Sequence, residues 1–283
     1  MLNLPTNLSE EFKRLYHGRG EKKYKFLTID SIDEVLFVQF YEKVDEKPFL
    51  EFLKDYIKNT RHKHIIVKRR YSNETYAFIG EIPQKYYAIE NGFKFILNFY
   101  NQNIGYFGDM KHTREYIRKI SKDKKVLNLF AYTCGFSMYA RRGGASEIIN
   151  VDMNKNVLIT GQKNHQINNL DLKNIRFLRR DVLKTSFKKY AFFDVIIIDP
   201  PSFQKGSFIA SKDYEKIIKK LKDISHKNTT LIACVNSPNI SKKDLINLVE
   251  KESDFKYKEE VKPPKEYTNS SLKSLVFEIK HMI

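Results

Sequence analysis

The second two-thirds of the chain alternates short apolar runs with helix-like segments, and this pattern restricts the fold more than any other feature. The clearest run, FDVIIIDPP at 193–201, is apolar enough to be a strand buried on both faces of a sheet. Strands that alternate with helices indicate βαβ units, and therefore an α/β fold with a parallel sheet covered on both faces. The other strand-like runs are 126–132, 147–153, 175–181 and 229–237, and the helix-like segments are 135–142, 156–169, 212–225 and 245–251.

The first hundred residues follow a different pattern and are expected to form a small α+β domain. An amphipathic helix begins at Pro48 among β-rich segments, and EEFKRLYHGRG at 10–20 is expected to form a short helix that runs into a basic loop. We therefore expect two domains, a small one at 1–98 and a larger one at 99–283. The expected strands of the small domain are 25–32, 34–42, 64–71 and 75–99, and an antiparallel pair near 254–261 and 273–280 closes the larger domain.

Composition is typical of a folded protein in a reducing compartment. The 283 residues contain two cysteines, Cys134 and Cys234, which are too few for a disulfide framework and lack zinc-ligand spacing, so we expect no metal. No apolar run approaches the roughly 20 residues that span a bilayer. The N-terminus has no signal-peptide core. We therefore expect a cytoplasmic protein with no membrane partner.

The chain is strongly basic, with 51 Lys and Arg against 34 Asp and Glu and a formal net charge of +17. Most of the excess follows residue 100, where 34 basic residues stand against 20 acidic ones. Such a charge attracts nucleic acid, an acidic protein or a membrane surface. A genome whose coding bias favours lysine would also raise the net charge. HGRG at 17–20 and the Lys68–Arg70 run are candidate phosphate contacts, although a single surface cation is more often only solvated.

Polar residues follow the apolar runs at the points where the strands are expected to end. In an open α/β sheet, ligands bind at the carboxyl ends of the strands. Gly135 lies in a strand-to-helix turn that matches neither a dinucleotide loop nor a Walker loop, and it lets the backbone approach a ligand. Asp152 is placed to accept both hydroxyls of a ribose, and Asp181 to accept from the amine of an adenine. A helix N-cap or a turn is the alternative role of each carboxylate.

The most specific pattern is DPPSF at 199–203, directly after a central apolar run. Two prolines stiffen this loop and remove two backbone donors. A carboxylate is thereby held beside an aromatic ring, and such a loop can grip a flat base that bears an amine by hydrogen bonding and stacking. NSP at 236–238 follows the next run and is expected to line the same crevice.

The order of these features resembles that of class I S-adenosylmethionine (SAM) methyltransferases. More closely, three segments are similar to the methyltransferase family of the bacterial 23S ribosomal RNA cytosine-C5 enzymes, which includes the guanine-methylating domain of a related fused enzyme. The resemblance implies a Rossmann-like domain with a mostly parallel seven-stranded sheet, preceded by a small α+β domain. We expect no counterpart of the RNA-binding PUA domain that the cytosine enzymes carry at their N-terminus. The three segments are NQNIGYFGDMKHTRE (101–115), VLNLFAYTCGFSMYARRGGA (126–145) and IIIDPPSFQKGSF (196–208).

The resemblance also implies roles for individual residues, with SAM as cofactor and S-adenosylhomocysteine (SAH) as its product. The implied cofactor contacts are Gln102, Phe107, Asp109 and Arg114 in a segment that folds over SAM, Asn128, Phe130, Tyr132 and Gly135 on its methionine side, Asp152 and Met153 at the ribose and adenine, Asp181 and Val182 at the adenine edge, and Asp199 beside the methyl sulfonium. The implied catalytic residues are Asp199, Pro200, Pro201 and Phe203.

One position departs from the cytosine-C5 pattern. Those enzymes place a nucleophilic cysteine at the end of the strand after D-P-P, where this chain has Asn236. Cys234 lies two residues earlier, inside LIACV, where we expect a small buried residue rather than the exposed thiolate that C5 chemistry needs. We expect Cys134 to pack near the cofactor. An amine needs only acceptors for its hydrogens and approximation to the methyl group, so we expect methylation of a base nitrogen.

The sequence therefore favours SAM-dependent methylation of a structured RNA, expected to be ribosomal. Three alternatives stay open. They are C5-cytosine chemistry through Cys234, a non-catalytic RNA-binding or assembly factor with the same fold, and a methyltransferase that acts on a protein or a small molecule. The sequence also leaves open the target nucleotide and whether the chain forms a homodimer.

Overall fold

The chain divides into two compact units in the computed structural model, which describes all residues except 1, 22, 202, 205–207, 268 and 280–283. Unit 1 comprises residues 1–109 and 264–270, and unit 2 comprises residues 110–263 and 271–283. The boundary between the units thus follows residue 109, whereas the sequence predicts one after residue 98. The difference arises because the carbonyl groups of residues 99–102 accept hydrogen bonds from Lys68 and Arg70 of unit 1.

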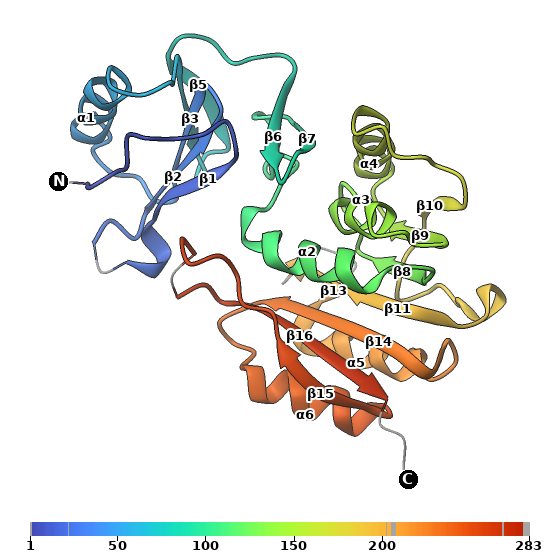
Figure 1. The fold of residues 1–283 in the computed structure, drawn as a ribbon. Coiled ribbons are helices and arrows are strands. Elements are labelled where there is room, and N and C mark those ends of the chain that lie inside the picture. Colours follow the sequence, from blue (N-terminus) through green and yellow to red (C-terminus); the bar gives the residue numbers. More distant parts are fainter. Residues whose placement is uncertain (1, 22, 202, 205–207, 268, 280–283) are drawn as a thin grey trace. The chain divides into compact units, whose positions relative to one another are not determined.

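Unit 1 contains a five-stranded sheet, one helix and a separate hairpin. Its elements are β1 (Lys13–His17), β2 (Leu27–Ile32), β3 (Val35–Phe40), α1 (Lys47–Ile57), β4 (His64–Arg69), β5 (Glu74–Ile79), β6 (Tyr86–Glu90) and β7 (Phe93–Leu97). The sheet has the order β1-β2-β3-β4-β5, in which only β3 and β4 are parallel, connected by α1 (Figure 1). Leu50, Leu53 and Tyr56 form the apolar face of α1 and pack on this sheet.

The segment 10–20 is not the helix that the sequence predicts. β1 pairs antiparallel with β2, and a single 3-10 turn follows at Gly18–Gly20. Local propensity is overridden here because the segment gains backbone hydrogen bonds at the sheet edge. A Cβ on Gly18 would lie 2.2 Å from the carbonyl oxygen of Tyr24 and 2.3 Å from that of Leu27, so the close turn requires glycine.

Unit 2 contains a seven-stranded sheet with helices on both faces. Its main elements are α2 (Lys111–Ile120), β8 (Lys125–Leu129), α3 (Gly135–Arg142), β9 (Glu147–Asp152), α4 (Lys155–Ile167), β10 (Ile175–Arg179), β11 (Phe193–Ile198), α5 (Ala210–Leu221), β14 (Ser225–Asn236), α6 (Lys242–Glu252), β15 (Phe255–Glu260) and β16 (Leu272–Ile279). The strand order is β10-β9-β8-β11-β14-β16-β15. The first five strands are parallel, and β16 is antiparallel to both neighbours. This arrangement confirms the predicted Rossmann-like, mostly parallel sheet and the antiparallel pair at its edge.

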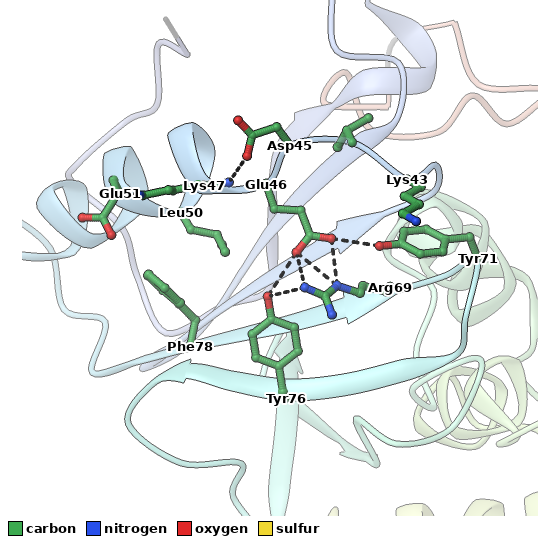
Figure 2. A pocket seen from close by; sticks show the side chains of 11 residues that line it. Lys43, Asp45, Glu46, Lys47, Leu50, Glu51, Arg69, Tyr71, Tyr76 and Phe78 are labelled. Atoms are coloured by element: carbon green, nitrogen blue, oxygen red, sulfur yellow. Dashed lines mark hydrogen bonds and ion pairs between the residues drawn. The ribbon is translucent and has the colours of Figure 1, made fainter.

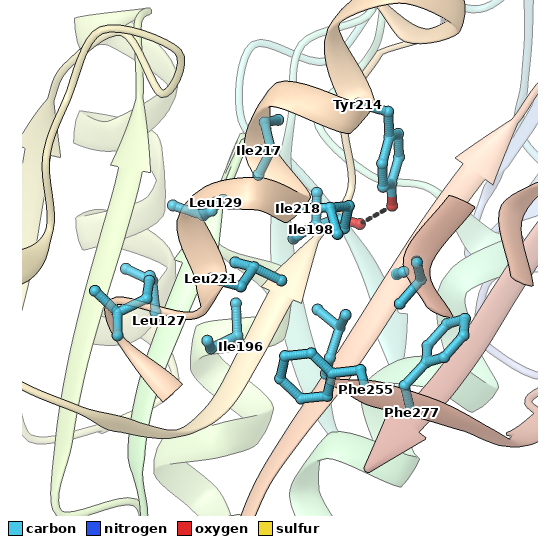
Figure 3. Packing of buried hydrophobic residues seen from close by; sticks show 14 of the residues in the cluster. Leu127, Leu129, Ile196, Ile198, Tyr214, Ile217, Ile218, Leu221, Phe255 and Phe277 are labelled. Carbon is cyan, nitrogen blue, oxygen red and sulfur yellow. Dashed lines mark hydrogen bonds between the residues drawn. The ribbon is translucent and has the colours of Figure 1, made fainter. Parts of the chain in front are cut away.

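The two faces of the sheet carry separate apolar cores, because alternate residues of each strand point to opposite sides. Ile196 and Ile198 of β11 pack toward α5, whereas Val195 and Ile197 belong to the core that α2 and α3 cover. Figure 3 shows the α5 side, where Tyr214 lies beside the end of β11. With both faces filled, only the strand ends remain for ligand contacts.

Candidate functional site

The loop between β8 and α3 has an unusual backbone. Phe130, Tyr132 and Cys134 have φ of +58°, +47° and +60°, in the left-handed region that costs a non-glycine residue on the order of 1 kcal/mol. The Ala131 N–H donates to the Val151 carbonyl at 2.9 Å, which ties the loop to β9. Gly135, where the sequence predicts the close backbone approach, is the first residue of α3 and follows this loop directly. Strain of this kind is a frequent property of ligand-binding loops, and here it lies in three larger residues.

Asp152 is the last residue of β9 and holds this loop in place. Its Oδ2 accepts the N–H of Tyr132 at 2.9 Å, and its Oδ1 accepts the N–H of Asn154 at 2.8 Å. Burial raises the pKa of the Asp152 carboxyl, and these backbone hydrogen bonds oppose that rise. The helix N-cap is Asn154 rather than Asp152. Each carboxylate oxygen has a second lone pair, so Asp152 retains acceptor capacity for two hydroxyls.

A chain of buried polar groups supports the site from below, and the sequence analysis missed it. The Asn128 Nδ2 donates to the Asn150 Oδ1 at 2.9 Å, and the Asn150 Nδ2 donates to the Ser137 Oγ at 3.0 Å. His165 continues the chain, with Nε2 2.9 Å from Ser137 Oγ and Nδ1 2.8 Å from the Gly161 carbonyl oxygen. Because a carbonyl only accepts, Nδ1 carries the proton and Ser137 donates to Nε2. This series of hydrogen bonds therefore requires a neutral His165.

The stability of the protein is expected to fall as the pH drops from 6.5 to 4. Burial lowers the pKa of His165 to about 4, so in this window the unfolded chain binds a proton that the folded chain does not. His165 alone is expected to lower the free energy of unfolding by roughly 3 kcal/mol across this window, and the full loss is reached near pH 4. Urea unfolding at several pH values should show that the free energy of unfolding depends less steeply on pH in His165→Asn. Some dependence should remain, because the pKa values of His17 and His62 are also lowered to about 4. An unchanged slope would contradict this, and His112→Asn at an exposed position controls for the loss of a histidine.

Gly161 of α4 allows the helix to pack directly on the strained loop. A Cβ at this position would lie 2.4 Å from Cys134 Sγ and 2.8 Å from Cys134 Cβ. We expect Gly161→Ala to lower the free energy of unfolding by about 1–3 kcal/mol. Cys134→Gly removes both clashing atoms and suits the φ of +60°, so the double variant should regain stability. Denaturant unfolding of both variants tests this, and a double variant with a lower free energy of unfolding than Gly161→Ala would refute the steric account.

The remaining adenine-side candidates lie at the ends of β9 and β10. Met153 is 38% exposed, and its carbonyl accepts from Arg179 Nε at 3.3 Å. The Asp181 Oδ1 accepts the N–H of Leu183 at 2.9 Å, so this carboxylate also organises a turn, as the alternative role predicts. The side chain of Val182 is buried in the core. Only Met153 and Asp181 of these three thus present side-chain atoms outside the core.

The D-P-P loop begins where β11 ends, between the parallel strands β8 and β14. Asp199 is half-buried, Pro200 is buried and Pro201 is exposed. Ser202 lies outside the described residues, as does the side chain of Phe203, the first residue of the short strand β12 (Phe203–Gln204). Beneath the loop, the Tyr214 hydroxyl donates to the Cys234 carbonyl at 3.0 Å and lies 3.5 Å from the Ile198 carbonyl. Tyr214, which the sequence did not single out, thus joins the ends of β11 and β14.

Cys234 is fully buried and does not reach the strand end. Its Sγ donates to the Ser274 Oγ of β16 at 3.5 Å, within the core on the α2 and α3 side. At the end of β14, Asn236 is exposed, and its Oδ1 accepts from the Ser271 Oγ at 2.5 Å. The edge of the sheet beside Asp199 therefore presents an amide and no thiol.

The segment implied to fold over the cofactor is divided between the units. Gln102, Phe107 and Asp109 belong to unit 1, where Phe107 is 43% exposed. Arg114 belongs to α2 of unit 2 and is 4% exposed. Within unit 2, the structure brings the ends of β8, β9, β10 and β11 to one edge of the sheet, as predicted. In the described part of the chain, no group of His, Cys, Asp and Glu is arranged to hold a metal, and no helix could span a membrane.

A pocket of about 520 Å³ lies in unit 1, beside α1, β4 and β5 (Figure 2). Its buried polar centre is Glu46, which accepts from Arg69 at 2.9 Å and from the hydroxyls of Tyr71 and Tyr76 at 3.1 Å. The carboxylate is thus satisfied by the walls of the pocket itself. We assign this network to the packing of α1 on the sheet.

Comparisons with known proteins agree with this architecture. Ribosomal RNA large subunit methyltransferase I of Aeromonas salmonicida is 39% identical over 132 residues, which cover 45% of this chain and 33% of that protein. Ribosomal RNA large subunit methyltransferase K/L of Pseudoalteromonas translucida is 33% identical over 206 residues, 68% of this chain and 29% of that protein. The aligned part is thus about a third of each of these relatives.

Solved structures match over nearly the whole chain. A Streptococcus mutans protein described as a SAM-dependent methyltransferase aligns with a TM-score of 0.84 and 25% identity over 96% of this chain and 76% of its own. Another protein described as a methyltransferase, solved in complex with SAH, gives a TM-score of 0.85 and 26% identity over the same shares. The sequence profile of S-adenosylmethionine-dependent methyltransferases matches residues 13–278. Because that profile spans both units, we conclude that the chain belongs to the S-adenosylmethionine-dependent methyltransferase family.

Proposed function

We propose that this chain transfers the methyl group of SAM to a base nitrogen in ribosomal RNA. The observation that carries the choice of nitrogen is the burial of both thiols. Cys134 and Cys234 are the only cysteines in the sequence, and each is 0% exposed. Attack on C6 of cytosine requires an accessible thiolate. Burial raises the pKa of the Cys134 thiol well above its usual value, which disfavours the thiolate further.

The residues at the sheet edge fit SAM as a ligand. The unused lone pairs of Asp152 suit the two hydroxyls of a ribose. The Asn128 Oδ1 is buried with no hydrogen-bond partner among the described residues, which costs about 1–3 kcal/mol. A donor such as the ammonium group of the methionine part would relieve that cost. Met153 and Asp181 are proposed for the adenine, and Gln102, Phe107, Asp109 and Arg114 for the segment that covers the cofactor.

Asp199 is the proposed catalytic carboxylate. SAM supplies an electrophilic methyl group on a sulfonium. Asp199 accepts a hydrogen bond from the target N–H, which aims the nitrogen lone pair and stabilises the positive charge that develops on nitrogen. As the new nitrogen–carbon bond forms, the carbon–sulfur bond breaks with SAH as the leaving group, and the carboxylate takes the proton that the methylated nitrogen loses. Pro200 and Pro201 offer no competing N–H donors, and Phe203 is proposed to stack on the base. In this mechanism the target nitrogen is the nucleophile, so the protein does not have to supply one.

Charge and the named relatives support RNA as the substrate. The relatives from Aeromonas and Pseudoalteromonas are ribosomal RNA large subunit methyltransferases by name. The net charge of +17 favours a polyanion as the ligand. Most of the excess of basic residues follows residue 100, in the part of the chain that forms the seven-stranded sheet.

Mass spectrometry of nucleosides tests the proposal. Total RNA from wild-type and deletion strains should differ in one methylated base, with the methyl group on nitrogen, and the purified protein should restore it on RNA from the deletion strain. Cys234→Ala should keep this activity. Loss of turnover in Cys234→Ala with intact SAH binding would establish C5 chemistry instead, and the absence of any SAM binding by calorimetry would favour a non-catalytic assembly factor.

A further inference from the structure

The arginines of unit 1 fall into two groups that differ in their partners. The unit contains five arginines, and three of them are neutralised by a carboxylate within 4 Å. Figure 2 shows one of these, Arg69, held by Glu46. The three ion pairs are Arg14–Asp30, Arg61–Asp33 and Arg69–Glu46.

The other two, Arg19 and Arg70, form no ion pair within the described part of the chain, and both lie at the same tyrosine. The Arg19 guanidinium carbon lies 4.2 Å from the centroid of the Tyr41 ring, and that of Arg70 lies 5.9 Å from it. Stacking on a ring uses the face of a guanidinium and leaves its edge available for donating to an oxyanion. Two guanidinium groups without a carboxylate therefore converge on one ring.

An exposed aromatic ring stands on the loop to which Arg70 is hydrogen-bonded. Tyr100 is 62% exposed. The fully buried Lys68 donates to the carbonyls of Phe99, Tyr100 and Asn101 at 3.3, 3.3 and 2.8 Å, and Arg70 donates to the carbonyl of Gln102. The loop that carries Tyr100 is thus held through four consecutive carbonyl groups, three bound by Lys68 of β4 and the fourth by Arg70 directly after it. Such a loop presents its ring at low conformational cost.

We propose that Arg19, Tyr41, Arg70 and Tyr100 form an RNA-binding surface on unit 1, an inference that rests on RNA being the substrate. Arg19 and Arg70 each donate to a phosphate, Tyr41 orients them, and a base of an unpaired stretch stacks on Tyr100. The occupant is RNA rather than an acidic protein because the surface pairs guanidinium groups with an exposed ring, and both the phosphate and the base of a nucleotide find a partner.

The test is RNA binding as a function of salt, measured by fluorescence anisotropy. The probe is an unmodified transcript of the large-subunit ribosomal RNA fragment that contains the target, and the proteins are the full chain and its variants. For Arg19→Ala with Arg70→Ala, we expect affinity to fall on the order of tenfold, and the slope of log K against log salt to flatten by about 1.5, since each contact to single-stranded RNA contributes about 0.7. Arg61→Ala is the matched control, because Arg61 is exposed in the same unit but paired with Asp33.

Tyr100→Ala separates stacking from charge. Loss of a stacked base should lower RNA affinity by about tenfold with an unchanged salt slope. SAH affinity should remain at the wild-type value in Arg19→Ala and Tyr100→Ala. If wild-type protein binds the probe with a steep salt slope and the double arginine variant binds equally well, the surface is refuted while the proposed function stands. If wild-type protein binds SAH but no RNA, the RNA substrate itself is refuted.

Discussion

Asp199→Ala should lower the rate of methyl transfer by a factor on the order of 10²–10³ while leaving SAH affinity within a few-fold of wild type. The substitution removes the acceptor proposed to aim the target nitrogen and to stabilise its developing positive charge, an interaction that matters most in the transition state. Single-turnover methylation of RNA from the deletion strain, with SAH binding followed by calorimetry, measures both quantities.

A control variant makes this result specific to the carboxylate. Cys234→Ala lies in the neighbouring strand β14 and should retain activity, because the thiol is buried in the core. An Asp199→Ala protein with full turnover would exclude the carboxylate from the reaction. A loss of SAH binding as large as the loss of rate would move Asp199 from catalysis to cofactor binding.

Asp152→Ala is expected to weaken binding of SAM and SAH alike by a factor on the order of 100. Two hydroxyl groups lose a charged acceptor, and hydrogen bonds to charged groups contribute roughly 1.5–3 kcal/mol each. The N–H groups of Tyr132 and Asn154 also lose their acceptor, so the β8–α3 loop keeps only its backbone hydrogen bond from Ala131 to Val151 as a tie to β9. Isothermal titration calorimetry with SAH gives the affinity.

The control for Asp152 is a carboxylate of unit 2 that is remote from the site. Asp171 is exposed and forms an ion pair with Arg141 at 2.8 Å, so Asp171→Ala removes a carboxylate without touching a strand end of the sheet. It should bind SAH as the wild type does. Wild-type SAH affinity in Asp152→Ala, with the fold intact by circular dichroism, would rule out ribose binding by this residue.

The sequence predicts the sheet well because its signal is local. A run such as FDVIII shows in six residues that both faces of the strand are buried, and the structure bears this out. Segment 10–20 has no such signal, because its strand form depends on hydrogen bonds to another strand, β2, and not on the pattern of its own residues. The insertion of β16 between β14 and β15 is a property of the whole sheet and has no local signature.

In the candidate site, too, the features with a local sequence signal are predicted and those that depend on tertiary packing are not. Asp152, Asp181 and Asp199 lie where an apolar run ends, so their place at the sheet edge follows from the sequence. The support beneath them does not, because Ser137 and His165 come together only when α3 and α4 pack. The left-handed turn also escapes prediction, since Phe130, Tyr132 and Cys134 are not residues that favour that conformation.

The assignment of residues 264–270 to unit 1 has a consequence for how this protein can be taken apart. The polypeptide passes from one unit to the other after residues 109, 263 and 270. Unit 1 is therefore not a cassette that a cut near residue 100 would release. An N-terminal fragment would lack Tyr267, whose ring lies 4.9 Å from the Arg14 guanidinium and 5.5 Å from the His17 ring. Exchange of this unit between relatives by recombination would need two matched segments rather than one.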